Sequence, residues 1–186
     1  SSDLLIAWFR KHFGKKNTDI YVHVLGAVVM FAMYFIGRNG GYNNSSNLLW
    51  LAIGFVLLGL PQGINNVITY AMIGDTVEYL EWKTGERAEG ICFSMQTFIN
   101  KISMAVGAFI GVMAYGISGI SPSDPYNTVT PEGSEKLWAV LILSGAISMV
   151  ATIIPMLFYK VTESKQREYV KEIEERKAAK AAKTAE

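Results

Sequence analysis

The sequence predicts an all-α integral membrane protein, a bundle of four transmembrane helices. Half of the 186 residues are hydrophobic, and they collect in long runs that leave the charges in the gaps between them. Each run is long enough for the roughly 20 helical residues that cross about 30 Å of hydrocarbon. Core helices of soluble proteins usually keep a polar face and have apolar runs of about 10–14 residues. A soluble helical bundle therefore fits this sequence less well.

The predicted organisation follows the runs. Residues 1–19 are expected to form the end of a preceding helix and a basic loop, and residues 160–186 a charged tail. The chain has no initial Met and no signal-peptide pattern, so we expect a carboxyl-terminal piece of a larger membrane protein. The four predicted spans are residues 20–37, 48–74, 91–118 and 137–159.

The basic residues predict the orientation of the chain. Fourteen of the 17 Lys and Arg residues lie before the first span, in the charged segment Asp75–Gly90, or in the tail. The positive-inside rule places these segments in the cytoplasm and the other two loops outside. We therefore expect a multi-pass protein of the cytoplasmic (inner) membrane with its carboxyl terminus inside.

Composition argues against several other classes of protein. The formal net charge of +1 gives no basis for nucleic-acid binding, and Cys92 is alone, so no internal disulfide forms. We find no metal-ligand cluster, phosphate loop or nucleophile–base arrangement. We therefore predict no enzyme, cofactor or metal site, and assign His12 and His23 structural roles.

The second span carries a polar face beside a predicted kink at Pro61. Its polar residues fall within about 60° of Gln62 around the helix axis. Hydrogen bonds between helices, typically about 0.6–2 kcal/mol each, are one explanation. We favour a substrate cavity, because four such groups sit together at membrane depth. They are Gln62, Asn65, Asn66 and Thr69.

The third span carries Lys101 near its middle. A central lysine costs about 2.5–3.5 kcal/mol on insertion, so it should face a cavity or a carboxylate. The alternative is a buried ion pair that only holds helices together. Ser94 and Thr97 fall within about 40° of Lys101 around the axis. An adjoining polar, small-residue stripe has Gln96, Asn100, Ser103, Gly107 and Gly111. The apolar side, expected to meet lipid, has Phe98, Ile99, Ile102, Val106, Phe109 and Ile110.

Two charged segments remain. The segment Asp75–Gly90 is either a solvated loop or a cytoplasmic latch that pairs with basic residues from another half of a transporter. The tail is a predicted helix with a small apolar side at Tyr169, Val170 and Ile173, expected to be solvated rather than bound to anionic lipid. The latch candidates are Asp75, Glu78, Glu81, Lys83, Arg87 and Glu89.

The motifs GDTVEYLEWKTGERAEG and SMQTFINK closely resemble those of the glycoside–pentoside–hexuronide:cation symporter family. This is the group of the melibiose permease within the major facilitator superfamily, and the resemblance spans about Gln62 to Gly111. It implies the last four helices of a twelve-helix transporter whose amino-terminal half, the main partner, is missing. It also implies symport of a sugar or glycoside with Na⁺ or H⁺ by alternating access, within membrane lipid.

The resemblance also implies roles for single residues. Lys101 matches a lysine of helix eleven near the cation and sugar sites, and Thr97 matches its neighbour. The charged residues of Asp75–Gly90 match a loop that helps gating. Asn66 stands where the melibiose permease has a tryptophan beside the sugar, so the resemblance does not extend to melibiose itself.

We therefore predict a cation-coupled sugar symporter. Two alternatives stay open: a non-transporting membrane sensor or interaction protein on the same helices, and a symporter of another amphiphile such as a lysolipid. A lipid carrier should show an apolar lateral opening. The predicted cavity residues are Lys101, Thr97, Gln96, Asn100, Gln62, Asn65 and Asn66.

Overall fold

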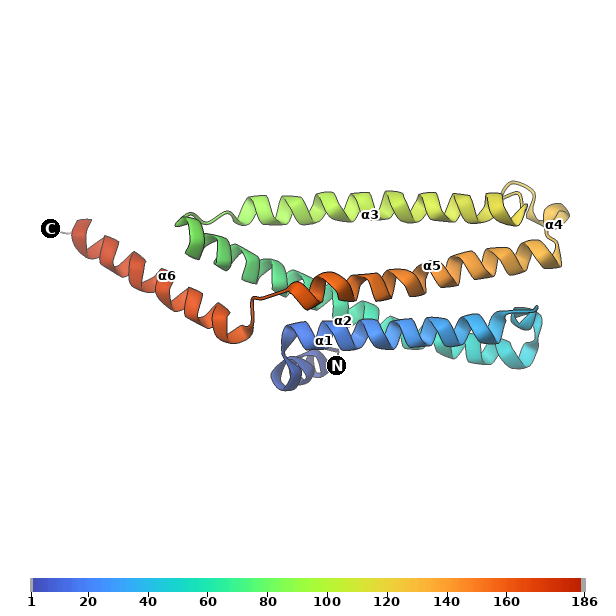
Figure 1. Ribbon diagram of the computed structural model, residues 1–186, viewed down its shortest axis with the longest axis horizontal. Coiled ribbons are helices and arrows are strands. Elements are labelled where there is room, and N and C mark those ends of the chain that lie inside the picture. The colour runs from blue at the N-terminus through green and yellow to red at the C-terminus, as the bar shows by residue number, and fades with distance from the viewer. Residues whose placement is uncertain (1, 185–186) are drawn as a thin grey trace.

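The computed structural model describes the backbone of residues 2–184 and the side chains of residues 12–183 (Figure 1). Every regular element in this part of the chain is helical, which confirms the predicted all-α class. Ser1 and residues 185–186 of the predicted tail lie outside the described residues. The elements are α1 (Ser2–Gly37), η1 (Gly41–Asn43), α2 (Ser45–Thr84), α3 (Glu89–Ser118), α4 (Pro125–Thr128), α5 (Pro131–Phe158) and α6 (Glu163–Thr184).

Four of these helices are long and apolar enough to cross a membrane: α1 from His12 onward, α2, α3 and α5. They run along the long axis of the molecule, which is horizontal in Figure 1, and α5 lies between α1 and α3. One end of the bundle gathers residues 12–19, 75–90 and 160–183, which we call the charged end. The short elements η1 and α4 lie at the other end.

Helices α1, α2 and α5 form the most closely packed part of the bundle. Methionines of α1 fill places where the neighbouring helix carries a glycine. A Cβ atom at Gly54 of α2 would lie 2.7 Å from the Cγ and Sδ atoms of Met33, which is only 1% exposed. A Cβ atom at Gly145 of α5 would lie 2.7 Å from Sδ of Met30. Small residues thus let these helices approach closely, as is common in membrane bundles.

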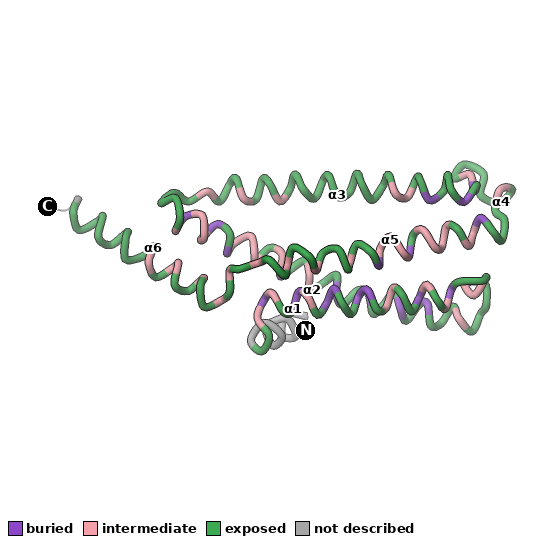
Figure 2. Tube along the Cα trace, in the orientation of Figure 1, coloured by how far each residue is buried: buried purple, intermediate pink, exposed green. Residues whose placement is uncertain are grey.

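Helix α3 is packed far more loosely. Along most of its length its residues are exposed, and Figure 2 shows it as an almost continuous exposed rod. The buried residues of α3 are Ala114 and Ser118, near its end away from the charged end. Its main contact is with α5.

The basic segment that the sequence predicted as a loop is helical on both sides of Gly14. This residue has φ 73° and ψ 166°, a conformation that glycine adopts readily and other residues almost never do. The helix therefore breaks here, and a new helical segment starts at Lys15. Helix α2 continues past the predicted end at Gly74 to Thr84, so much of the charged segment is helical.

The starts of α2 and α5 are set by side-chain caps. The Asn44 side chain accepts a hydrogen bond from the Ser46 backbone N–H at 3.0 Å. The Thr130 hydroxyl accepts one from the Gly133 N–H at 3.0 Å, and Pro131 occupies the first turn. Both caps satisfy N–H groups that lack a partner within the helix.

Candidate functional site

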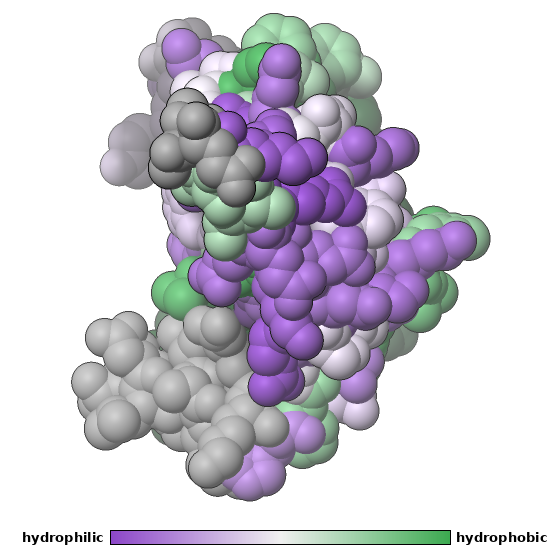
Figure 3. All heavy atoms as spheres, turned by 90° about the vertical axis from the view of Figure 1, so that its left-hand side faces the viewer, coloured by the Kyte–Doolittle hydropathy of each residue, from purple (hydrophilic) through white to green (hydrophobic). Residues whose placement is uncertain are grey.

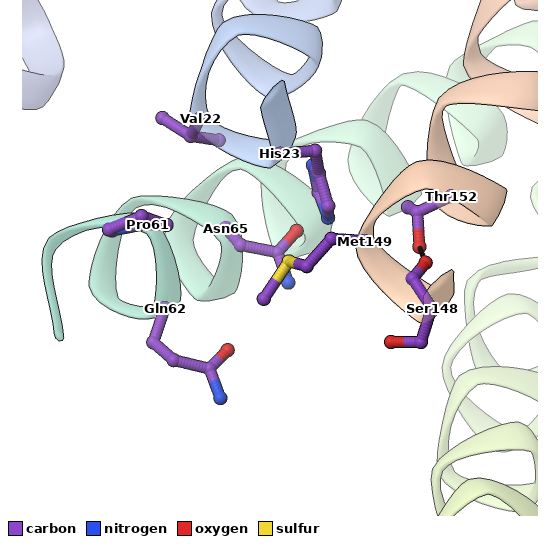
Figure 4. Close-up of a pocket in the computed structure, with 8 residues that line it drawn as sticks. All are labelled: Val22, His23, Pro61, Gln62, Asn65, Ser148, Met149 and Thr152. Atoms are coloured by element: carbon purple, nitrogen blue, oxygen red, sulfur yellow. Dashed lines mark hydrogen bonds between the residues drawn. The ribbon is translucent and has the colours of Figure 1, made fainter. Parts of the chain in front are cut away.

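A polar cavity of about 210 Å³ lies among α1, α2 and α5 (Figure 4). Each of the three helices contributes polar side chains to it, so it is not a simple packing gap. In Figure 4 the His23 ring extends from α1 toward Asn65 and Met149. The lining residues are Val22 and His23 from α1, Pro61, Gln62 and Asn65 from α2, and Ser148, Met149 and Thr152 from α5.

A second cavity of about 260 Å³ adjoins the first toward the charged end. The two share Asn65 and Thr152, so polar groups continue from Gln62 down to Tyr159. Thr69 also lines the second cavity, and its hydroxyl donates to Asn65 Oδ1 at 3.4 Å.

The polar face predicted on α2 divides between these cavities and the surface. Gln62 and Asn65 line the first cavity, and their role in binding a substrate remains a prediction. Asn66 is exposed and lines neither of the two cavities. It lies about 100° further around the helix than Asn65, which turns it away from them.

The polar residues predicted on α3 lie apart from this cavity. Thr97, Asn100 and Lys101 are exposed. The Gln96 side-chain amide donates to Asn100 Oδ1 at 3.3 Å, and the Thr97 hydroxyl donates to the Phe93 carbonyl at 3.0 Å. Lys101 has no ion pair or hydrogen bond with any residue that the structure describes. The structure thus brings the α2 residues and the α3 residues to separate places.

The opposite side of α3 faces α5 across a groove of about 490 Å³. Ser103, Gly107 and Gly111 line this groove, as their small size predicts. Ile102, Val106 and Ile110 line it too. Ile102 and Val106 stay exposed along this open groove, so their contact with lipid remains a prediction. Periodicity could not show which neighbour covers an apolar side. The groove lies roughly 180° around the axis from Lys101, which therefore points away from α5.

At the charged end, Asp75 forms a buried ion pair with Lys15. The Lys15 Nζ atom lies 2.6 Å from Asp75 Oδ1 and 2.7 Å from Oδ2. Both residues are buried, at 7% and 4% exposure. This pair joins α2 to the start of the second segment of α1.

The same junction holds α5 and α6. The Lys15 backbone N–H donates to Glu163 Oε1, so a carboxylate from α6 caps the helical segment that restarts after Gly14. Lys16 Nζ donates to the Leu157 and Tyr159 carbonyls at the end of α5, at 2.8 and 3.0 Å. Burial raises the pKa of the Tyr159 phenol, and the nearby Asp75 adds to the rise, so the phenol stays protonated.

The other predicted gating residues also have partners within this chain. Glu78 accepts a hydrogen bond from the Gln166 side chain at 2.6 Å. The buried Glu81 carboxylate pairs with Lys177 at 2.6 Å and with Arg87 at 3.1 Å. Arg87 also pairs with Glu89 at 3.1 Å, and the carboxylates of Glu89 and Glu81 raise the pKa of its guanidinium. Lys83 Nζ lies 5.9 Å from the centre of the Tyr79 ring.

Comparison with known proteins identifies the family to which this chain belongs. The profile of the family described as MFS/sugar transport protein matches residues 2–163. The chain belongs to this family. The assignment confirms the resemblance seen in the charged motif and the helical transporter fold expected from it. The family is one of transport proteins rather than enzymes.

Curated relatives agree with the family. The chain is 33% identical over 94% of its length to a provisionally named sulfoquinovose importer of Escherichia coli K12, of which it covers 35%. It is 28% identical over 88% of its length to a glucuronide carrier protein homolog of the same strain, covering 34%. It is 26% identical over 85% of its length to an isoprimeverose transporter of Lactiplantibacillus pentosus, covering 31%. The chain thus spans about a third of the length of these relatives. No solved structure matches it.

Docking of α6 is a feature of this family member that sequence reasoning missed. The tail was expected to be solvated, but α6 packs against the charged end of α2. The ring centroids of Tyr169 and Trp82 lie 4.6 Å apart, and Ile173 is buried. The Trp82 indole N–H donates to Glu172 at 2.7 Å, and Arg176 donates to the Trp82 carbonyl at 2.7 Å. Figure 3 shows the hydrophilic surface that this end presents.

A buried Asp19–His23 pair in the second segment of α1, after Gly14, was missed as well. His23 was assigned a structural role, yet it lines the first cavity, and Asp19 lines the second. The available signal was the i, i+4 spacing of an acid just before the predicted first span and a histidine inside it. In the part of the chain that the structure describes, no cluster of three or more His, Cys, Asp or Glu could hold a metal ion.

Proposed function

We propose that this chain forms the carboxyl-terminal membrane part of a sugar or glycoside transporter that works by cation-coupled symport and alternating access. The observation that carries the proposal is the polar cavity among α1, α2 and α5, set at membrane depth within an MFS/sugar transport fold. Its amide and hydroxyl groups are suited to the hydroxyls of a sugar. The coupling ion would be Na⁺ or H⁺.

In this proposal, Lys101 faces the part of the transporter that lies opposite α3. A lysine at mid-depth with no described partner favours pairing with a carboxylate there or with an acidic substrate. Two relatives are named for acidic sugars, sulfoquinovose and glucuronides, and one for the neutral isoprimeverose. The remaining residues assigned to the substrate and cation cavity are Thr97, Gln96, Asn100, Gln62, Asn65 and Asn66.

The charged end would lie in the cytoplasm of the inner membrane and act in gating. The positive-inside pattern supports this orientation. The ion pairs of Asp75 and Glu81 support the gating role, because they join α2 to α1 and α6 and must rearrange if these helices move apart. The gating residues are Asp75, Glu78, Glu81, Lys83, Arg87 and Glu89.

The test is uptake into liposomes by the complete transporter that carries this chain. The panel contains a sulfonated sugar, a glucuronide, a neutral glycoside and a lysolipid, each with and without a Na⁺ or pH gradient. Accumulation of one sugar class driven by a gradient is the expected result. Binding of a sugar without any flux would overturn the proposal in favour of a sensor.

The α3–α5 groove favours the lysolipid alternative as the second candidate. Its lining is mostly apolar and it lies beside an exposed helix. This is the lateral opening expected of a lipid carrier. Flux of the lysolipid, with no sugar flux, would decide for it.

A further inference from the structure

The Asp19–His23 pair is buried in α1, where its membrane-crossing part meets the charged end. Asp19 is 4% exposed and His23 is 6% exposed. Asp19 Oδ2 lies 3.3 Å from His23 Nδ1, and the Asp19 backbone carbonyl lies 2.8 Å from the same nitrogen. His23 is about 12 Å along the axis from Lys15. Ionisable residues at such a place in a membrane helix point to function.

The contacts of Nδ1 fix the form of the neutral ring. A backbone carbonyl can only accept, so Nδ1 must carry the hydrogen that it donates to Asp19. The lone pair of the neutral ring is therefore on Nε2. No hydrogen bond joins Nε2 to any residue that the structure describes, and the ring lines the cavity (Figure 4).

The surroundings leave this nitrogen without a competing protein charge. The residues that α2 and α5 place in the cavity are all neutral. The nearest charges lie toward the charged end: Lys15 is paired with Asp75, Lys16 holds the end of α5, and Glu163 caps Lys15. The Tyr159 phenol is neutral there. Asp19 is thus the carboxylate that faces His23.

We propose that Asp19 and His23 form a proton-binding site of this transporter. A proton from cavity water binds the Nε2 lone pair, and the imidazolium that forms is neutralised by the Asp19 carboxylate beside Nδ1. The cavity of about 210 Å³ has room for several waters at about 30 Å³ each, and the adjoining cavity extends this route toward the charged end.

The consequence for transport rests on the proposed function. The proton site and the amides of Gln62 and Asn65 line one cavity, so a bound sugar and a bound proton would share it. Binding of one can then change the affinity for the other by a coupling free energy. This deepens the proposed symport by assigning H⁺ a site on this chain.

The experiment compares two activities of the full-length transporter in liposomes with one labelled sugar. The first is sugar exchange without any ion gradient, and the second is accumulation driven by an inside-alkaline pH gradient. His23→Gln and Asp19→Asn should lower the ratio of accumulation to exchange by about tenfold or more. His12→Gln, a matched change at the other histidine of this chain, should keep the wild-type ratio.

The outcomes separate this inference from the proposed function. If the wild type exchanges sugar but a pH gradient drives no accumulation, or if both variants keep the wild-type ratio, the proton site is wrong and the sugar carrier stands. If no sugar is exchanged at all, the proposed function fails.

In that last case, and if Asp19→Asn does not fold, ¹⁵N NMR of the histidine rings in the wild type still decides. The His23 signal, identified by its loss in His23→Gln, should show a protonated Nδ1 throughout and an Nε2 that gains a proton as pH falls from about 8 to 5. A ring protonated on Nε2 alone, or one that does not change across this range, would overturn the inference.

Discussion

The charged end and the Lys101 side of α3 differ in whether their charged side chains have partners. At the charged end, the carboxylates of Asp75 and Glu81 are buried and paired with lysines from other helices, at 2.6 Å in both cases. On α3, Lys101 stands in the middle of a membrane-spanning helix with no partner among the described residues, on the side turned away from α5.

The difference separates charged residues that find their partners within the described chain from Lys101, whose partner must lie elsewhere. Ion pairs and hydrogen bonds at the charged end hold α1, α2, α5 and α6 together, so removing one partner should loosen the structure. Removing Lys101 breaks no ion pair or hydrogen bond in the described chain. Its cost in the membrane has to be offset by a partner or a ligand on the open side of α3. The predictions below, measured on the full-length protein, run from the largest expected loss of stability to none.

Lys15→Met should lower the free energy of unfolding by about 3–5 kcal/mol, because it leaves the Asp75 carboxylate buried and unpaired. Thermal unfolding of the purified protein measures the loss. The double variant Lys15→Met/Asp75→Leu should recover most of it, since it removes both charges. Lys83→Met is the matched control, because this lysine is exposed on the same end of α2. Equal losses in Lys15→Met and Lys83→Met would contradict the buried pair.

Gly14→Ala should cost about 1–3 kcal/mol, because alanine cannot easily adopt φ 73° and its methyl group would meet the Glu163 carboxylate at 3.1 Å. The same unfolding experiment measures it. Gly116→Ala is the control: a Cβ there has open space within α3, so no loss is expected. A harmless Gly14→Ala would mean that the break in α1 does not depend on this glycine.

Trp82→Phe should weaken the docking of α6 by about 1 kcal/mol, because it removes the hydrogen bond to Glu172 while keeping an aromatic ring. Limited proteolysis within α6 should then run about fivefold faster. Trp50→Phe, at an exposed tryptophan of α2, should leave the rate unchanged. Fast cleavage of α6 in the wild type would show that the tail is solvated, as its sequence had indicated.

Much of the architecture could be predicted from the sequence, because a bilayer demands long apolar runs and leaves few alternatives to helices. The spacing of polar residues on α2 also predicted that Gln62 and Asn65 would share a cavity. Residue spacing fixes the direction of each side chain around the axis of one helix, so it can predict which residues of that helix share a face.

The parts that could not be predicted are contacts between distant segments. Nothing in the sequence joins Lys15 to Asp75 or to Glu163, because each pairing depends on how three helices meet. The apolar side of α6 is small, so its docking on Trp82 was missed. The same limit explains why the sequence did not show that Ile102, Val106 and Ile110 border a groove beside α5.

The most direct test of the central claim is gradient-driven sugar uptake by Lys101→Ala in the full-length transporter, at matched expression and beside Lys160→Ala, a change at an exposed lysine outside the assigned sites. We predict an unchanged unfolding temperature for Lys101→Ala and a loss of coupled uptake of about tenfold or more, while Lys160→Ala transports normally. A well-folded Lys101→Ala protein that accumulates sugar like the wild type would contradict the account.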